Sequence, residues 1–348
     1  MRPKTLPAKA YTDPARLETE IESILRPAWH CIGRADELSG PGDFLTITLL
    51  DEPVLVVRGD DGELRALSNI CRHRGMPVAD GTGSSATFTC PYHAWSYATD
   101  GELRVAPFTA PEAVTECRLP SWPLTIDTHG FVHVAVCDTP APLPSIPVLD
   151  DELAPFDPAA MRFRHVETEI WACNWKAMVE NFMEGSHLSV VHQNTLHPLT
   201  PSRLASKGPS SPEVTSYYSA FPSGVRSTTP GEPGLSDAQR GRSFLWQRFP
   251  TQVACQNATF CATFLVTPLA VDRTMIRWSV SAFRECPDEL VDSTIALWRE
   301  INGEDQAVLE RLQRNLRAPS TQGYAGPLAD DDREGTIADF HRYLEQAP

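Results

Sequence analysis

The sequence predicts an α+β protein in which a small all-β domain precedes a larger domain built on an antiparallel sheet. Strand-like segments with alternating apolar residues recur between residues 43 and 136. A proline-rich stretch at 138–149 is then typical of a linker. After it, strand patterns are interleaved with two helical patterns. We therefore predict an N-terminal helical segment at 1–39 that packs on the larger domain, the β domain at 40–140, and the larger domain at 141–348.

The elements of the first part follow from periodicity and turn signals. A helix is predicted over residues 12–26, where Leu17, Ile21 and Leu25 have helical spacing and Pro27 follows. Strands are predicted from the segments DFLTITLL, EPVLVVRG and ELRALSNI. A hairpin is predicted around Asp100–Gly101, and a last strand from GFVHVAV.

In the second part, HVETEIWAC predicts a strand and the segment after it a helix. Residues 197–236 are rich in Pro, Ser, Thr and Gly, which predicts a long surface loop or a lid. Further strands are predicted at 243–248, 259–268 and 274–283, and a final long helix at 287–317.

Composition narrows the possible partners and the compartment. The 348 residues carry a formal net charge of −15, which argues against nucleic acid and anionic membranes as partners. The first residues lack the apolar core of a signal peptide, and no run approaches the ~20 apolar residues needed to span a bilayer. Nine scattered cysteines do not form a disulfide framework pattern. We therefore expect a cytoplasmic protein whose paired Cys and His residues bind metal.

Two cysteines and two histidines in CRHRGMPVADGTGSSATFTCPYHAW, residues 71–95, predict the first metal site. Cys71 pairs with His73, and Cys90 pairs with His93. Structural zinc is one interpretation, because two Cys and two His satisfy tetrahedral zinc. Zinc spacings usually pair Cys with Cys and His with His, whereas each pair here mixes the two. The mixing favours a Rieske [2Fe–2S] cluster, in which two thiolates hold one iron and two imidazoles the other.

The second metal site is predicted from NWKAMVENFMEGSHLSVVHQN, interpreted as a helix over residues 174–194. Glu184 and His187 lie on the face opposite the apolar residues of this helix. His187 and His192 are five residues apart, about 140° on an ideal helix, so they converge only if the helix widens or ends there. Two convergent histidines with one carboxylate form the facial triad of non-haem Fe(II) oxygenases.

The carboxylate is predicted on the final helix. In WREINGEDQAVLERLQRNL, Glu304 lies about 100° away from Asp305 around the helix. A charge on a buried stripe is costly unless it is paired or bound to metal, so Asp305 is the better candidate ligand. Asp305 shares the apolar, inward-facing stripe with Trp298, Ile301, Leu309, Leu312 and Leu316.

These motifs, in this order, resemble the α subunits of Rieske non-haem iron oxygenases over nearly the whole chain. CRHRG and CPYHAW match the cluster loops of that family, NWKxxxENxxExxHxxxxH matches its catalytic helix, and EDxxxxExxQ matches the segment with the third iron ligand. The resemblance implies a Rieske β domain joined to a helix-grip, START-like catalytic domain. It implies cluster ligands at Cys71, His73, Cys90 and His93, and ligands of a mononuclear Fe(II) at His187, His192 and Asp305.

The resemblance also implies how electrons reach the iron. Glu184 occupies the position of the acid that links an iron-ligating histidine, here His187, to a cluster-ligating histidine of the neighbouring subunit, here His93. Family members form rings, typically trimers, so a homotrimer is expected. A separate flavin and iron–sulfur reductase, or a ferredoxin, is expected to pass electrons from NAD(P)H, and O2 is expected to react at the Fe(II). Asn181 is expected to line the site.

Glutamate at position 184 favours the choline, carnitine and betaine-type monooxygenase branch, because many ring dioxygenases carry Asp there. The expected reaction is hydroxylation or oxidative demethylation of a small substrate such as a quaternary amine, with attack on an aromatic ring as the alternative. A Rieske electron carrier or a zinc-stabilised binding protein is the non-enzymatic alternative. A cationic substrate calls for an aromatic or acidic cage. Candidates for a cage, or equally for an apolar slot, are Tyr217, Tyr218, Phe221, Trp246, Phe249 and Phe260.

Overall fold

The computed structural model describes residues 4–158, 161–225 and 233–346, and the chain divides into two compact units. One unit is Arg26–Leu143, and the other combines the chain up to Leu25 with the chain from Pro144 onward. The first boundary therefore follows Leu25 instead of residue 39. The reason is strand β1 (His30–Arg34), which is buried throughout and pairs with β11 (Phe131–Val134) inside the β-rich unit.

The unit Arg26–Leu143 consists of three antiparallel sheets and short connections. The strands predicted from alternation and from the hairpin signal are confirmed. One sheet has the order β1-β11-β10, with β10 at Leu124–Ile126. The five-stranded sheet contains β5 (Thr82–Ser84), β2 (Asp43–Leu49), β3 (Glu52–Arg58), β4 (Leu64–Ser68) and β9 (Ser121–Trp122) in that order. The third sheet contains β6 (Thr87–Thr89), β7 (Ser96–Ala98) and β8 (Leu103–Val105). The unit also has two 3-10 turns, η2 (Ala35–Glu37) and η3 (Pro111–Ala113).

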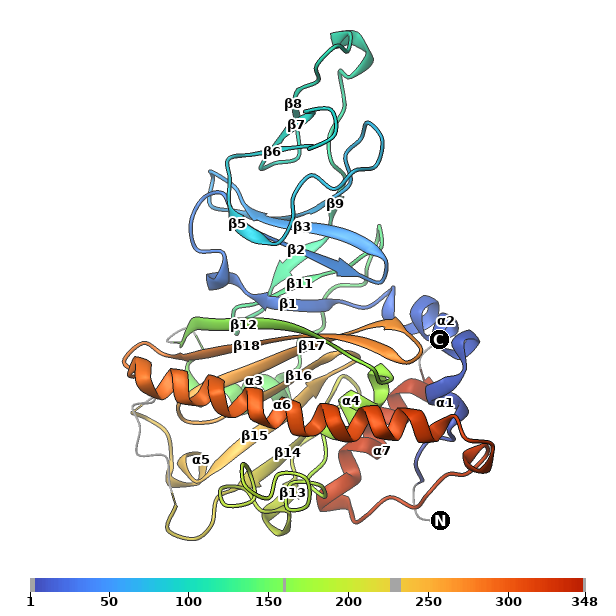
Figure 1. The fold of residues 1–348 in the computed structure, drawn as a ribbon. Helices are drawn as coiled ribbons and strands as arrows, with labels where there is room; N and C mark the ends of the chain where they lie inside the picture. The colour runs from blue at the N-terminus through green and yellow to red at the C-terminus, as the bar shows by residue number, and fades with distance from the viewer. Residues whose placement is uncertain (1–3, 159–160, 226–232, 347–348) are drawn as a thin grey trace. The chain divides into compact units, whose positions relative to one another are not determined.

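A seven-stranded antiparallel sheet forms the frame of the other unit (Figure 1). All the strands predicted after the linker are confirmed, and three further strands, β13, β14 and β16, complete the sheet. In spatial order the strands are β12 (Met161–Trp171), β18 (Arg273–Phe283), β17 (Phe260–Ala270), β16 (Gln252–Gln256), β15 (Arg242–Arg248), β14 (Val214–Ala220) and β13 (Ala205–Lys207).

The predicted long loop at 197–236 is wrong at two places, because β13 and β14 lie within it. The sequence of β14, VTSYYSA, is rich in serine, which resembles a loop by composition. In the structure its serines are buried inside the sheet. Residues 226–232, in the last third of the predicted loop, lie outside the described residues.

Helix α6 (Asp288–Leu316) lies across one face of the seven-stranded sheet (Figure 1), and it confirms the predicted final helix. Its buried side runs through Trp298, Ile301 and Asp305 as predicted, but Leu312 is 43% exposed. Gln313 takes the buried position because it lies four residues, about one turn, after the buried Leu309.

The remaining α-helices belong to the same unit. Helix α4 (Trp175–Phe182) packs on β17 and α6, and α7 (Asp331–Gln346), which the sequence analysis did not predict, packs on β13 and β14. Near the N-terminus, Asp13 caps α2 by accepting from the Ala15 N–H at 3.0 Å. The predicted helix at 12–26 is α2 followed by a π-helical turn. The bounds are α1 (Lys9–Thr12), α2 (Pro14–Glu20), η1 (Ile21–Leu25), α3 (Pro147–Leu153), η4 (Ala154–Phe156), η6 (Ser202–Leu204), α5 (Asp237–Arg240) and η7 (Pro319–Thr321).

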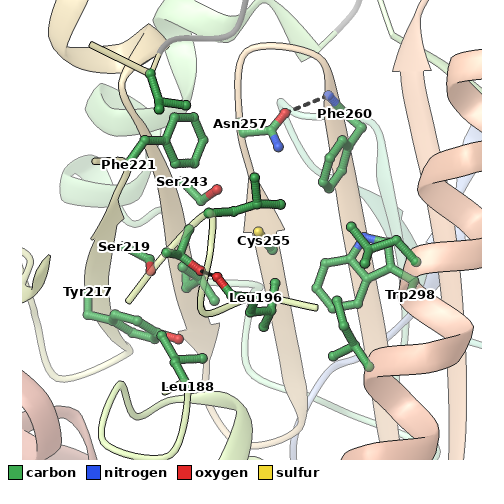
Figure 2. A pocket seen from close by; sticks show the side chains of 16 residues that line it. Leu188, Leu196, Tyr217, Ser219, Phe221, Ser243, Cys255, Asn257, Phe260 and Trp298 are labelled. Atoms are coloured by element: carbon green, nitrogen blue, oxygen red, sulfur yellow. Dashed lines mark hydrogen bonds between the residues drawn. The ribbon is translucent and has the colours of Figure 1, made fainter. Parts of the chain in front are cut away.

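A cavity of about 200 Å³ lies between the sheet and α6 (Figure 2). This volume is below the range of roughly 300–1,000 Å³ that is usual for sites of drug-sized ligands, so the cavity suits a small molecule. Its walls come from β14, β15 and β16 on one side and α6 on the other. Among the helices of the described ranges, none combines the length and the apolar character required to traverse a bilayer.

Candidate functional site

The two loops of the β-rich unit that carry the Cys and His pairs close in the same way. The N–H of Gly75 donates to the carbonyl of Cys71 at 3.0 Å, and the N–H of Ala94 donates to the carbonyl of Cys90 at 3.0 Å. Gly75 (φ +80°) and Ala94 (φ +58°) both adopt the left-handed conformation at the equivalent position. Each loop therefore turns tightly around its cysteine, although only one of them uses glycine for the turn.

The loops bring their predicted ligands together. The rings of His73 and His93 lie 4.6 Å apart between centroids, and Cys71 and Cys90 are buried in one core cluster with Trp95. The Nδ1 atom of His93 is buried and has no hydrogen-bond partner among the described residues. Two buried thiols, two adjacent imidazoles and an unpartnered ring nitrogen fit a [2Fe–2S] cluster held by two Cys and two His.

Tyr97 is a neighbour of this site that sequence reasoning missed. Its side chain is fully buried, its hydroxyl accepts from the Arg72 N–H at 2.9 Å, and the same hydroxyl lies 3.3 Å from the Cys71 Sγ. Burial and then the hydrogen bond with Cys71 raise the pKa of Tyr97. Because a cluster-bound cysteine is a thiolate, the hydroxyl must donate to it. The available signal was the Tyr two residues after the end of CPYHAW.

We predict that Tyr97→Phe lowers the reduction potential of the cluster by roughly 40 mV. A hydrogen bond to a ligand sulfur favours the reduced, more negative cluster, and losing ~1 kcal/mol of that preference corresponds to this shift for one electron. The potential is measured by redox titration of the cluster's visible spectrum. Tyr92→Phe is the matched control, because it removes a tyrosine hydroxyl from the neighbouring cluster loop, and that hydroxyl contacts Arg74 and not a cysteine. Equal potentials in all three proteins would contradict the prediction.

In the unit that contains the seven-stranded sheet, Asn174 and Gln313 join the start of α4 to α6. The Asn174 side chain caps α4 by accepting from the Lys176 N–H at 3.0 Å. The Asn174 N–H in turn donates to the Gln313 Oε1 at 3.0 Å, and Gln313 Nε2 donates to the Tyr11 carbonyl at 2.9 Å. These bonds hold the two segments that carry the predicted iron ligands in a set relation.

The predicted helix at 174–194 is too long, because α4 ends at Phe182. The Glu184 carboxylate accepts hydrogen bonds from the backbone N–H groups of Ser186 and His187. These bonds replace the ones that the same N–H groups would make in a continued helix. Gly185 also packs so closely that a Cβ there would lie 2.4 Å from the Ala205 Cβ. Of the two ways for the histidines to converge, the helix therefore ends and does not widen.

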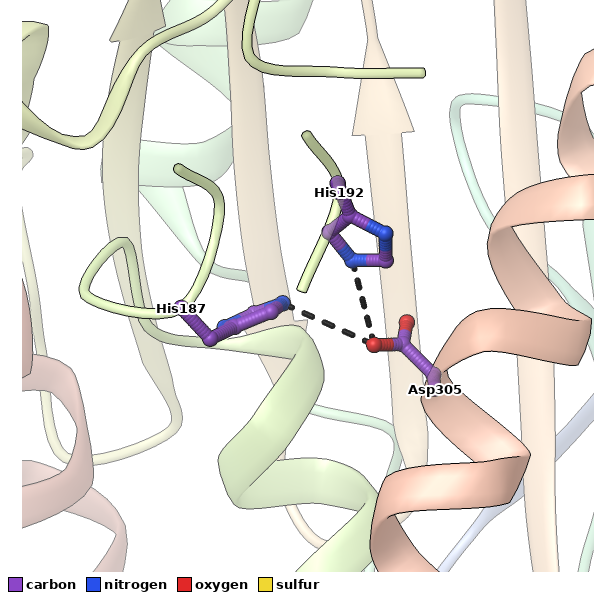
Figure 3. Close-up of side chains that lie close together, drawn as sticks. All are labelled: His187, His192 and Asp305. Atoms are coloured by element: carbon purple, nitrogen blue, oxygen red, sulfur yellow. Dashed lines mark ion pairs between the residues drawn. The ribbon is translucent and has the colours of Figure 1, made fainter. Parts of the chain in front are cut away.

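His187, His192 and Asp305 converge on one point (Figure 3). The Asp305 Oδ1 lies 3.1 Å from the His192 Nε2 and 3.7 Å from the His187 Nε2. The His192 Nε2 and the Asp305 Oδ1 are buried, and neither has a hydrogen-bond partner among the described residues. Ligands held about 2.1 Å from one metal ion are separated by roughly 3–4 Å. The three side chains therefore fit a 2-His-1-carboxylate metal site.

Each histidine of this triad is oriented by a glutamate on its other ring nitrogen. The His187 Nδ1 bonds to Glu184 Oε1, and the His192 Nδ1 bonds to Glu304 Oε2 at 2.6 Å. Carboxylates at both Nδ1 atoms leave the Nε2 lone pairs free to face Asp305.

The same glutamates affect the pKa values of both histidines. Burial alone lowers the pKa of His187, but Glu184 and Asp305 outweigh it and raise that pKa. The pKa of His192 is likewise lowered by burial but raised overall by Asp305 and Glu304. Protons are thus held tightly in the metal-free site, and a metal ion must displace them.

Glu304 contacts the triad, a role that its position on the helix, away from the buried side, did not predict. It lies off the buried stripe as predicted, yet its Oε2 accepts from both the His192 Nδ1 and the Thr195 Oγ1, the latter at 2.7 Å. Its partners are more than 100 residues away in the sequence, so only the packing of the loop after α4 against α6 reveals the role.

Glu304→Gln is expected to weaken binding of a divalent metal at the triad by about 10–100-fold, the usual cost of losing an outer-shell carboxylate. A neutral amide accepts more weakly from His192 and Thr195, so the imidazole is held less firmly. Affinity is measured by Co²⁺ titration of metal-free protein. Glu300→Gln, an exposed position on the same helix, is the control. Equal metal affinities for the two variants would show that Glu304 does not support metal binding at the triad.

The predicted role of Asn181 in lining the site stays a prediction. It lies on α4 and is partly buried, and no hydrogen bond in the described ranges joins it to His187, His192 or Asp305.

Three of the six aromatic candidates line the cavity: Tyr217, Phe221 and Phe260. Tyr218, Trp246 and Phe249 do not. Tyr218 follows Tyr217 on β14, so its side chain points to the opposite face of the sheet. Trp298 completes the aromatic lining from α6 (Figure 2), and Leu188 connects the cavity to the adjacent His187.

Comparison with known families agrees with this geometry. Residues 28–123 match the Rieske [2Fe–2S] domain, and residues 156–347 match the catalytic domain of the ring-hydroxylating alpha subunit, which is more than half of the chain. The chain belongs to the ring-hydroxylating alpha subunit family. It is therefore an oxygenase with a Rieske [2Fe–2S] cluster and a mononuclear iron, and it needs O2, a small-molecule substrate and electrons from a reductase. The electron-carrier and zinc-protein alternatives are excluded.

Individual relatives include oxygenase subunits of two monooxygenases. The glycine betaine monooxygenase oxygenase subunit of Chromohalobacter salexigens is 33% identical over 56% of this chain, and the match spans only 44% of that relative. The carnitine monooxygenase oxygenase subunit of Escherichia coli (strain K12) is 27% identical over 98% of this chain and 93% of its own length. A solved quaternary ammonium Rieske monooxygenase superposes with a TM-score of 0.82 at 22% identity, over 99% of this chain and 96% of the other. At that identity the likeness shows the fold.

Proposed function

We propose that this chain is the oxygenase component of a monooxygenase that hydroxylates or oxidatively N-demethylates a small quaternary amine. The observation that carries the proposal is the triad His187, His192 and Asp305 beside a small cavity walled by aromatic side chains. Aromatic faces attract quaternary ammonium groups, and the cavity volume suits a small substrate. The names of the relatives that act on glycine betaine and carnitine support the same substrate class.

In this proposal the triad binds the mononuclear iron, and the cluster is held by Cys71, His73, Cys90 and His93. Iron held by the triad would supply the chemistry of O2 reduction, with single electrons from the cluster. The balance is one C–H bond, one O2, two electrons and two protons giving one C–OH and one water. If the carbon is an N-methyl group, the N-hydroxymethyl product then releases formaldehyde and the demethylated amine.

The protein side chains orient the metal ligands and exclude water from the cavity. Glu184 and Glu304 hold the two imidazoles so that their Nε2 atoms face Asp305. Leu188, next to His187 in the chain, and Tyr217 line the cavity with largely apolar surface, which would exclude water from the reacting carbon.

We also propose that the enzyme is a homotrimer in the cytoplasm, in which Glu184 joins His187 to His93 of the partner subunit. A carboxylate that accepts from His187 keeps further lone pairs for a second imidazole. The buried Nδ1 of His93 suits the cluster, which leaves its Nε2 for an outside acceptor. A separate flavin and iron–sulfur reductase, or a ferredoxin, supplies the electrons from NAD(P)H. No disulfide is present within the described residues, which suits a reducing compartment.

The test is product formation by iron-replete protein with NADH and a surrogate reductase, against a panel of quaternary amines and aromatic acids. We expect substrate-stimulated O2 uptake matched by the hydroxylated or demethylated amine. Coupled turnover of an aromatic acid, with amines inert, would overturn the proposed substrate class while leaving the oxygenase assignment intact.

A further inference from the structure

The sheet side of the cavity carries a pair of serines among mostly apolar neighbours. Ser219 on β14 and Ser243 on β15 are directly paired in the sheet register, and both line the cavity (Figure 2). Continuing the register by one step from Phe244 and Gln256 places Asn257 opposite Ser243, and Asn257 also lines the cavity. Three neutral polar side chains therefore follow one another across neighbouring strands.

The hydroxyl of Ser219 has no hydrogen-bond partner within the described residues, although the side chain is only 3% exposed. Three other buried hydroxyls in the described ranges are also unpartnered, those of Ser186, Thr267 and Ser281, but none of these residues lines the cavity. A buried hydroxyl without a partner is unfavourable unless a ligand or water forms the missing hydrogen bond. Because Ser219 faces the cavity, a substrate atom is in position to do so.

The position of Ser219 fits the far end of a small substrate. Tyr217 lies two residues earlier on the same strand and faces the cavity near Leu188, the neighbour of His187. Two residues along a strand advance about 6.7 Å. Leu188 and Tyr217 therefore mark the end of the cavity next to His187 in the chain, and Ser219 lies further along the same wall (Figure 2).

We propose that Ser219, assisted by Ser243, forms a subsite that hydrogen-bonds a neutral oxygen of the substrate. The substrate class is then a quaternary amine with a hydroxyl or carbonyl oxygen, bound with an N-methyl group toward the triad. Neutral hydroxyls suit a neutral oxygen, because an ionised carboxylate in apolar surroundings calls for a cation. The cavity lining in the described ranges contains no Lys or Arg. This inference rests on the proposed function and refines it.

The test compares two amines of similar size, choline and propyltrimethylammonium, of which only choline carries a hydroxyl. Their dissociation constants are measured by calorimetry on the oxidised holoenzyme, which binds without turnover. We expect the wild type to prefer choline by about fivefold to tenfold, the usual contribution of one hydrogen bond. In Ser219→Ala this preference should fall to about one, while binding of propyltrimethylammonium stays the same.

Ser281→Ala is the matched control, because it removes another buried, unpartnered hydroxyl of the same sheet outside the cavity. It should retain the preference for choline. If propyltrimethylammonium binds but neither variant changes the preference, or if glycine betaine binds more tightly than choline, the subsite proposal is overturned and the amine proposal stands. If neither amine binds, the proposed substrate class itself is overturned.

Discussion

Asp305→Ala is expected to lose the mononuclear iron and at least about 100-fold of product formation while the [2Fe–2S] cluster remains intact. Outer-shell changes alone cost about 10–100-fold, and this change removes one of three ligands. The carboxylate is also the group that both Nε2 atoms face, at 3.1 Å and 3.7 Å. Without it, the site keeps only two neutral ligands and loses the negative charge that attracts a metal cation.

The measurement for Asp305→Ala is metal content after anaerobic reconstitution, combined with the visible and electron paramagnetic resonance spectra of the cluster. Asp292→Ala is the control, since Asp292 is exposed on the same helix. Full iron occupancy with normal turnover in Asp305→Ala would show that another acid completes the site.

Glu184→Gln, reconstituted with excess iron to offset weaker binding at His187, is expected to keep both metal centres filled and to lose roughly 10–100-fold of NADH-driven turnover. Glutamine keeps one oxygen for the backbone N–H groups of Ser186 and His187, so the loop after α4 is preserved. It loses the negative charge and one acceptor oxygen, which in our proposal join His187 to His93 of the partner subunit. Alanine is a poorer test, because it would also leave those backbone N–H groups without their acceptor.

Two assays separate electron transfer from chemistry in Glu184→Gln. The first follows reoxidation of a pre-reduced cluster in the presence of substrate and O2, which should slow. The second supplies hydrogen peroxide, which carries both the oxygen and the electrons and therefore needs only the iron site. Peroxide-driven product formation should stay close to wild type. Loss of both activities to the same extent would assign Glu184 to support of His187 alone.

The secondary structure was predictable wherever its signal was local. Alternation identified β2, β3, β17 and β18, and a 3.6-residue period identified α6. The prediction was wrong where side chains changed the local preference. Serine-rich β14 resembles a loop by composition, and α4 ends early because Glu184 binds backbone N–H groups that would otherwise continue the helix.

The sequence by itself indicated the family and was enough to propose the two ligand sets. Cys71 and His73, like Cys90 and His93, lie within a few residues of each other, so their convergence needs only a tight loop. The family match then covers both domains. Helical phasing was likewise enough to select Asp305 over Glu304 as the residue on the buried side of α6.

Only the tertiary structure decided which distant groups complete the site. It placed Glu304 on His192 and Tyr97 on Cys71, and it selected three of six aromatic candidates for the cavity wall. It also left the Ser219 hydroxyl facing that cavity without a partner in the described part of the chain. The physical reason is that periodicity and spacing are encoded within a few residues, whereas the partner of a buried polar group depends on which remote segment packs against it.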